Sequence, residues 1–152
     1  MSSSSKIDVN EVLRQLRASG NVLEELVEVF SEEAEEHLRS IYDGLDRLRV
    51  DANDSEALSD VRRASHTLKG AAGAVGMEPI TRVSHRMEDM LDCLVETSRG
   101  PSDSQLELFL ATTDLMQDLT TSEFDFDEAA DTLLGVYQEY DCLLYTSPSP
   151  RD

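Results

Sequence analysis

From about Val22 to Val50 an apolar residue recurs every three or four positions, and this spacing constrains the fold more than any other feature of the chain. At about 100° per residue, it places the apolar side chains on one stripe of an α-helix. Glutamates fill the positions between them and form a solvated face. Such a helix must bury its stripe against other elements. The apolar positions are Leu23, Val27, Phe30, Ala34, Leu38, Ile41, Leu45 and Leu48.

The rest of the sequence predicts further helices, and no segment alternates apolar and polar residues as a strand would. Asp54 or Ser55 can cap a second helix and Gly76 can end it, while Pro79 suits a helix start. The helices are expected over about Ile7–Ala18, Glu56–Val75, Pro79 to at least Leu94, Asp103–Leu119 and, more weakly, Asp127–Tyr140. Their expected inward positions are Leu58, Val61, Ala64, Leu68, Ala72, Val75, Ile80, Val83, Met87, Met90 or Leu91, Leu94, Leu106, Phe109 or Leu110, Thr113 and Met116.

This pattern predicts an all-α fold, an antiparallel up-down four-helix bundle with an extra C-terminal helix and a short N-terminal leader helix. Residues 1–6 are expected to be a disordered leader, residues 7–20 the leader helix and residues 21–141 the bundle domain. Residues 142–152 resemble the translation of a sequencing adapter, so they are set aside as non-native. The alternative is a natural Ser/Pro-rich linker. With the adapter interpretation, the natural protein is expected to continue beyond Asp141.

The charge of the chain excludes several classes of function. Its 32 acidic and 13 basic residues give a formal net charge of −19, which is unsuited to binding nucleic acid or an anionic membrane. No apolar run is long enough to span a membrane, and no secretory signal is visible. Two cysteines are too few for a disulfide framework or a structural zinc site, and we expect no metal in this chain. Cys93 is expected to be a small helix residue rather than a reactive thiol.

One face of the second predicted helix departs from this acidic pattern. His66 points about 200° away from Ala64 and Leu68, and therefore away from the core stripe. Its face is shared by Arg62, Lys69, Gly70 and Gly73. Glycines inside a helix cost about 1 kcal/mol each relative to alanine, so their presence needs a reason. Close approach by another protein is one reason; close helix packing beside an incidental surface histidine is the alternative.

The third predicted helix carries His85 and Glu88, which also lie off its apolar stripe. His66 and Glu88 are about equally far from the turn near Met77, so antiparallel helices would bring them to the same height. A carboxylate on one imidazole nitrogen fixes the tautomer and makes the other nitrogen more basic, as a nucleophilic histidine requires. The alternative is that His85 and Glu88 form an ordinary surface pair.

The segment Ala64-Ser-His-Thr-Leu-Lys-Gly-Ala-Ala-Gly-Ala-Val-Gly76 resembles the His-x-x-Lys-Gly motif of histidine phosphotransfer (Hpt) domains. It is most similar to the N-terminal phosphotransfer domain of chemotaxis histidine kinases. The resemblance covers about Val22 to Asp141 and departs from the pattern in the leader helix, Ser65 and Ala71. The segments that also resemble this domain are Phe30-Ser-Glu-Glu-Ala-Glu-Glu-His-Leu38, Ser84-His-Arg-Met-Glu-Asp-Met-Leu91 and Leu110-Ala-Thr-Thr-Asp-Leu-Met-Gln117.

The resemblance implies a role for the residues around His66 on the second and third predicted helices. His66 would accept a phosphoryl group through Nε2, and Lys69 would help to neutralise the phosphoryl oxygens. Glu88 would bond to Nδ1 of His66, with His85 in the same network. Gly70 would leave room for the approaching partner, with Gly73 and Arg62 on the same binding face. His37, in the acidic helix, is expected to be a solvated surface residue.

The resemblance also implies the partners. A histidine kinase catalytic domain would supply the phosphoryl group from ATP with Mg²⁺, and an aspartate on a response-regulator receiver domain would accept it. No nucleotide-binding motif occurs in the chain, so by itself it would be a phosphocarrier without an ATP site. The resemblance further implies that it is part of a protein-histidine kinase and that it is cytoplasmic. One alternative is a stand-alone or hybrid-kinase relay protein. Another is a helical docking module that is never phosphorylated.

Overall fold

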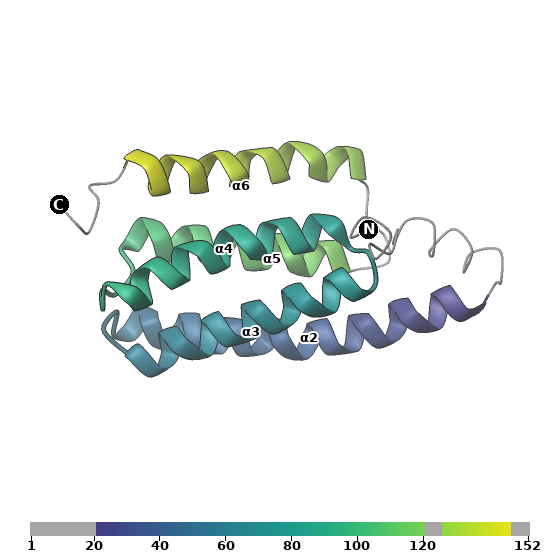
Figure 1. Cartoon of the computed structure of the whole chain (residues 1–152), viewed down its shortest axis with the longest axis horizontal. Helices are drawn as coiled ribbons and strands as arrows, with labels where there is room; N and C mark the ends of the chain where they lie inside the picture. Colours follow the sequence, from purple (N-terminus) through teal and green to yellow (C-terminus); the bar gives the residue numbers. More distant parts are fainter. Residues whose placement is uncertain (1–20, 121–125, 147–152) are drawn as a thin grey trace, which may run out of the picture.

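The computed structural model describes residues 21–120 and 126–146, which form five helices and no strand (Figure 1). The all-α prediction is therefore confirmed for this part of the chain. The predicted leader helix at Ile7–Ala18 and the polar leader before it lie outside the described residues. The helices are α2 (Asn21–Val50), α3 (Ser55–Ala74), α4 (Glu78–Glu96), α5 (Asp103–Thr120) and α6 (Phe126–Thr146).

Four of these helices close a ring around one core. Helix α2 packs against α3 and α5, and α4 packs against the same two helices from the other side. Helix α6 lies along the outer side of α4 and α5 (Figure 1). This is the predicted four-helix bundle with an extra C-terminal helix. None of the helices in the described ranges has a stretch apolar enough to cross a membrane.

The helix ends lie within one residue of prediction for α2, α3 and α5, but α6 is longer than predicted. It was expected to end at Tyr140 and instead continues to Thr146, into the segment that resembles an adapter. Leu143 in this extra stretch is partly buried against the core. Leu133, nearer the start of the same helix, is partly buried in the same way. The apolar contact supplies the packing that extends the helix.

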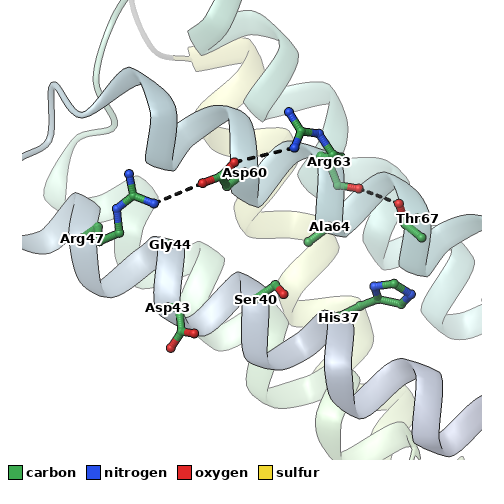
Figure 2. Close-up of a pocket in the computed structure, with 9 residues that line it drawn as sticks. All are labelled: His37, Ser40, Asp43, Gly44, Arg47, Asp60, Arg63, Ala64 and Thr67. Atoms are coloured by element: carbon green, nitrogen blue, oxygen red, sulfur yellow. Dashed lines mark hydrogen bonds and ion pairs between the residues drawn. The ribbon is translucent and has the colours of Figure 1, made fainter.

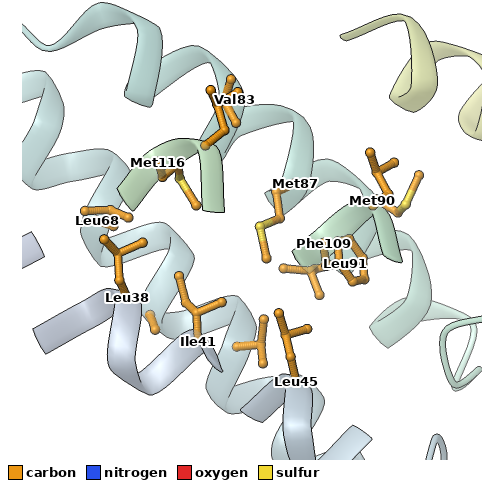
Figure 3. Close-up of a cluster of buried hydrophobic side chains, with 14 of the residues drawn as sticks. Leu38, Ile41, Leu45, Leu68, Val83, Met87, Met90, Leu91, Phe109 and Met116 are labelled. Carbon is orange, nitrogen blue, oxygen red and sulfur yellow. The ribbon is translucent and has the colours of Figure 1, made fainter. Parts of the chain in front are cut away.

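The buried side chains follow the predicted stripes closely (Figure 3). Met90 and Leu91 are both buried, whereas Phe109 is buried and Leu110 only partly so. Val75 is also only partly buried. Helix α5 buries additional positions because α6 covers a second side of it. The additional positions are Leu108, Thr112, Leu115 and Leu119.

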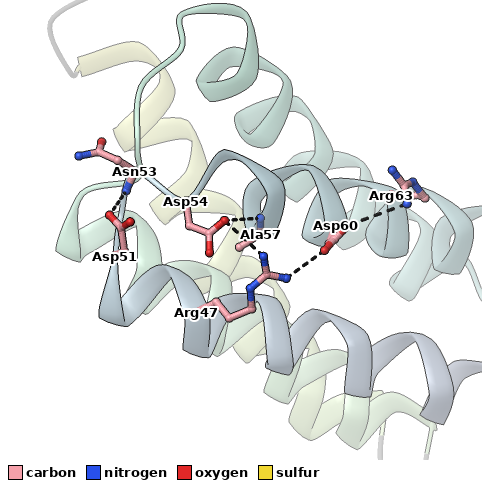
Figure 4. A network of polar contacts seen from close by, with 7 residues as sticks. All are labelled: Arg47, Asp51, Asn53, Asp54, Ala57, Asp60 and Arg63. Carbon is pink, nitrogen blue, oxygen red and sulfur yellow. Dashed lines mark hydrogen bonds and ion pairs between the residues drawn. The ribbon is translucent and has the colours of Figure 1, made fainter.

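Local signals in the sequence fix the turns between the helices. Asp54, one of the two predicted caps, accepts a hydrogen bond from the Ala57 backbone at 2.9 Å, and Arg47 of α2 contacts the same carboxylate at 3.3 Å (Figure 4). After α3, Gly76 adopts a φ of 76°, a left-handed conformation that glycine takes most readily. The Met77 amide then donates to the carbonyl of Ala72 at 2.9 Å.

Candidate functional site

The turn at Gly76 folds α4 back along α3, and this places two predicted site residues opposite each other. Nδ1 of His66 on α3 lies 2.7 Å from Oε1 of Glu88 on α4. The His66 side chain is 67% exposed, whereas that of Glu88 is only 13% exposed. The contact predicted from their equal distance to the turn is therefore present, with the imidazole facing solvent.

The second oxygen of Glu88 is also paired. Nζ of Lys69 lies 2.6 Å from Oε2 of Glu88. Lys69 is three residues after His66, so both side chains reach the same carboxylate from neighbouring positions on α3. Glu88 thus holds His66 with one oxygen and Lys69 with the other.

These contacts determine the charge of Glu88. Burial raises the pKa of this carboxyl, but hydrogen bonds from Lys69 and His66 outweigh that effect, and its pKa lies below the ordinary value. Glu88 is therefore ionised at neutral pH and can only accept hydrogen bonds. It follows that Nδ1 of His66 carries a proton, which leaves the lone pair of the neutral ring on Nε2. No side chain in the described ranges bonds to that nitrogen.

The helix glycines beside His66 leave open surface. A Cβ atom built at Gly70 would meet nothing within 4 Å, and one at Gly73 would meet only Thr81 Oγ1, at 4.0 Å. Neither position requires glycine for packing inside the bundle. The alternative explanation of close helix packing is therefore wrong for Gly70, and the free space lies one turn from the imidazole.

An exposed imidazole with a free Nε2, a buried carboxylate behind it and a cleared helix face are features of a histidine that exchanges groups with another protein. The family model that matches this chain is that of the Hpt domain, over residues 25–122. This chain belongs to the Hpt domain family. All the site residues described above fall inside the matched range.

The curated relatives of this Hpt domain include chemotaxis proteins named CheA. It is 34% identical to CheA of Rhizobium meliloti over 103 residues, which is 68% of this chain and 14% of that protein. It is 39% identical to CheA of Halobacterium salinarum over 70 residues, 46% of this chain and 10% of that protein. It is 26% identical to CheA of Bacillus subtilis over 103 residues, which is 68% of this chain and 15% of that protein. The chain thus spans only between about a tenth and a seventh of these relatives' length.

Two residues predicted for the site of this Hpt domain have other partners. Nε2 of His85 lies 3.6 Å from Asp89 on its own helix, and within the described residues it joins no contact with His66 or Glu88. The expectation that His85 shares the Glu88 network is therefore wrong, because its side chain points along the exposed side of α4. Arg62, predicted as a binding residue, is held by Asp92 with Nε 2.6 Å from Oδ1.

The structure has a groove between α2 and α3 that sequence reasoning missed (Figure 2). Its volume is about 450 Å³. His37, expected to be solvated, is half-buried in its wall. Thr67, the residue after His66, lines this groove, whereas His66 itself contacts Glu88 on α4. Its lining residues are His37, Ser40, Asp43, Gly44, Arg47, Asp60, Arg63, Ala64 and Thr67.

Proposed function

We propose that His66 is the phosphoryl acceptor of this Hpt domain. The observation that carries the proposal is the hydrogen bond from Nδ1 to the ionised Glu88, which assigns the lone pair of the neutral ring to Nε2 on a side chain that is exposed. A nucleophilic histidine needs this combination of a fixed tautomer, a basic second nitrogen and free access. Membership of the Hpt family supports the assignment, because the range that matches the family model contains both His66 and Glu88.

The reaction proposed for this site is phosphoryl transfer in two steps. The Nε2 lone pair attacks the γ-phosphorus of ATP, the bond between that phosphorus and the bridging oxygen breaks, and ADP leaves. The ring gains positive charge in this step, and Glu88 stabilises that charge through the Nδ1 proton. In the second step an aspartate carboxylate attacks the phosphorus, the P–N bond breaks, and Nε2 recovers its lone pair.

Lys69 has two tasks in this proposal. In the unphosphorylated domain its ammonium group stabilises the ionised form of Glu88 at 2.6 Å. Because it lies one turn from His66, its positive charge also attracts the phosphoryl oxygens once the phosphorus is bonded to Nε2. Gly70 leaves space for the partner active site that must approach the same nitrogen.

The partners that we propose rest on membership of the Hpt family. We propose that a histidine kinase catalytic domain brings ATP and Mg²⁺ to His66, and that a response-regulator receiver domain takes the phosphoryl group. We also propose a cytoplasmic location, because ATP, the phosphoryl donor in this proposal, is a cytoplasmic substrate. The similarity to CheA proteins favours a chemotaxis-type kinase over a stand-alone relay protein.

The test uses all three histidines of the chain, His37, His66 and His85. Each is changed to glutamine, and each variant is incubated with a chemotaxis-type kinase core and ATP labelled on the γ-phosphate. We expect acid-labile label on the wild type and on the variants at positions 37 and 85, and none on His66→Gln. Equal label on His66→Gln would reject the assignment. Absence of label on every form would favour the docking-module alternative.

A further inference from the structure

A second ion pair joins α3 to α4 one helical turn from His66. Nε of Arg62 lies 2.6 Å from Oδ1 of Asp92, and the two side chains are 45% and 37% exposed. The contacted oxygen of Asp92 is itself shielded from solvent, although its side chain is partly exposed. The guanidinium of Arg62 therefore contacts a buried oxygen of Asp92, although both side chains are partly exposed to solvent.

This pair and the His66–Glu88 pair are consecutive contacts along one seam. Arg62 lies four residues before His66 on α3, and Asp92 lies four residues after Glu88 on α4. Residues four apart on a helix are neighbours on its surface, so Glu88 is the carboxylate one turn from Asp92 on the side of α4 that faces α3. The charged groups along this seam are Arg62 and Lys69 on α3 and Glu88 and Asp92 on α4.

We propose that Asp92 is a positioning residue for phosphotransfer: by holding Arg62, it keeps the guanidinium away from Glu88 and preserves the Glu88–His66 hydrogen bond. The inference rests on the proposed function of His66. A free guanidinium would compete strongly for Glu88, because its planar group can donate two parallel hydrogen bonds to one carboxylate. It would displace Nδ1 of His66 from Oε1, so the imidazole would lose its fixed tautomer.

The test compares the full chain with Asp92→Asn, which removes the charge that holds Arg62. We expect initial phosphorylation of His66 to slow about tenfold, the lower end of the effect of removing a supporting hydrogen bond. Nitrogen chemical shifts of the His66 imidazole, measured without kinase, should show the proton no longer confined to Nδ1. Replacing Arg62 as well, in Arg62→Gln/Asp92→Asn, should recover most of the rate and the wild-type shifts.

The matched control is Asp141→Asn, which removes another ion pair of α4, that between Asp141 and Arg86 at 2.7 Å, on the side facing α6. We expect this variant to keep the wild-type rate and shifts. Circular dichroism checks that each variant folds, and Asp92→Ser replaces Asp92→Asn if the latter does not.

Unchanged shifts and rate in Asp92→Asn would overturn the inference. So would a loss that persists after Arg62 is replaced, because Asp92 would then act through packing alone. A wild-type chain that is never phosphorylated would overturn the proposed function instead, and the imidazole shifts would still decide whether Asp92 protects the His66–Glu88 bond.

Discussion

His66 and Glu88 lie 22 residues apart in sequence, on different helices, and share a hydrogen bond of 2.7 Å. The bond joins an exposed imidazole to a largely buried carboxylate. Because Glu88 is largely buried, packing in the bundle fixes the orientation of its carboxylate. The hydrogen bond to that carboxylate in turn fixes the orientation of the exposed imidazole. The rigid core thus positions the reactive nitrogen without covering it.

Replacing Glu88 with glutamine should slow phosphorylation of His66 by about 10- to 100-fold while the fold stays intact. Glutamine keeps the volume of the side chain but removes the negative charge that stabilises the phosphorylated ring. Rates with a chemotaxis-type kinase core and ATP would measure the loss, and circular dichroism would check the fold. An unchanged rate would remove Glu88 from the mechanism.

The charge of Glu88 should also make part of the stability depend on pH. Its pKa in the folded chain lies below the ordinary value of 4.5, so its ion pairs stabilise the fold above that pH and are lost as pH falls through the folded value. The wild type should therefore exceed Glu88→Gln in free energy of unfolding at about pH 7, and the difference should shrink by about pH 3. Urea unfolding at both pH values measures it; a constant difference would contradict this account.

Gly70 should affect partner access rather than folding. Because a Cβ at this position meets nothing within 4 Å, Gly70→Ala should stabilise the helix by up to about 1 kcal/mol. The longer Gly70→Gln should slow phosphotransfer by filling the space beside His66. Gly135 on α6 is equally open, so Gly135→Ala and Gly135→Gln are the matched controls. Equal phosphotransfer rates in both glutamine variants would show that the space beside His66 is not used.

The contact between His66 and Glu88 could be predicted because helical geometry is regular. Two residues at the same distance from a tight turn reach the same height on antiparallel helices, and Gly76 with Pro79 marked that turn in the sequence. The core stripes were predictable for the same reason, since burial follows the helical period.

Side-chain choices among several partners could not be predicted in this way. His85 had Glu88 and Asp89 within reach on its own helix, and the structure pairs it with Asp89. Spacing alone does not distinguish positions three and four residues away. The second buried side of α5 was missed because its cover, α6, has a weak apolar pattern, and burial of Thr112 has no apolar signature.

Gly44 is a further feature that the apolar pattern did not reveal, and it should be essential for packing. A Cβ at this position would lie 2.4 Å from Cγ2 of Val61, where α2 and α3 approach closely. Gly44→Ala should therefore destabilise the fold by about 1–3 kcal/mol, despite the better helix propensity of alanine. Thermal unfolding would measure this. A melting temperature equal to or above that of the wild type would show that the helices can separate without cost.

Tyr140 should anchor α6 to the bundle through a hydrogen bond as well as through its ring. Its side chain is fully buried, and its hydroxyl lies 2.5 Å from Oγ1 of Thr112 on α5. Thr112 already donates its proton to the carbonyl of Leu108 at 2.7 Å, so Tyr140 is the donor in the shared bond. Burial raises the pKa of the Tyr140 phenol, so the hydroxyl keeps this proton at neutral pH.

Tyr140→Phe should then lower the free energy of unfolding by about 1 kcal/mol, the usual net value of one hydrogen bond. Tyr140→Ala should cost about 3–5 kcal/mol, because it also leaves a cavity under α6. Urea unfolding of both variants separates the two contributions. Because His66 lies on α3, which does not contact α6, the phosphorylation rate of Tyr140→Phe should match the wild type. A slower rate at full helix content would mean that α6 also controls the site from across the bundle.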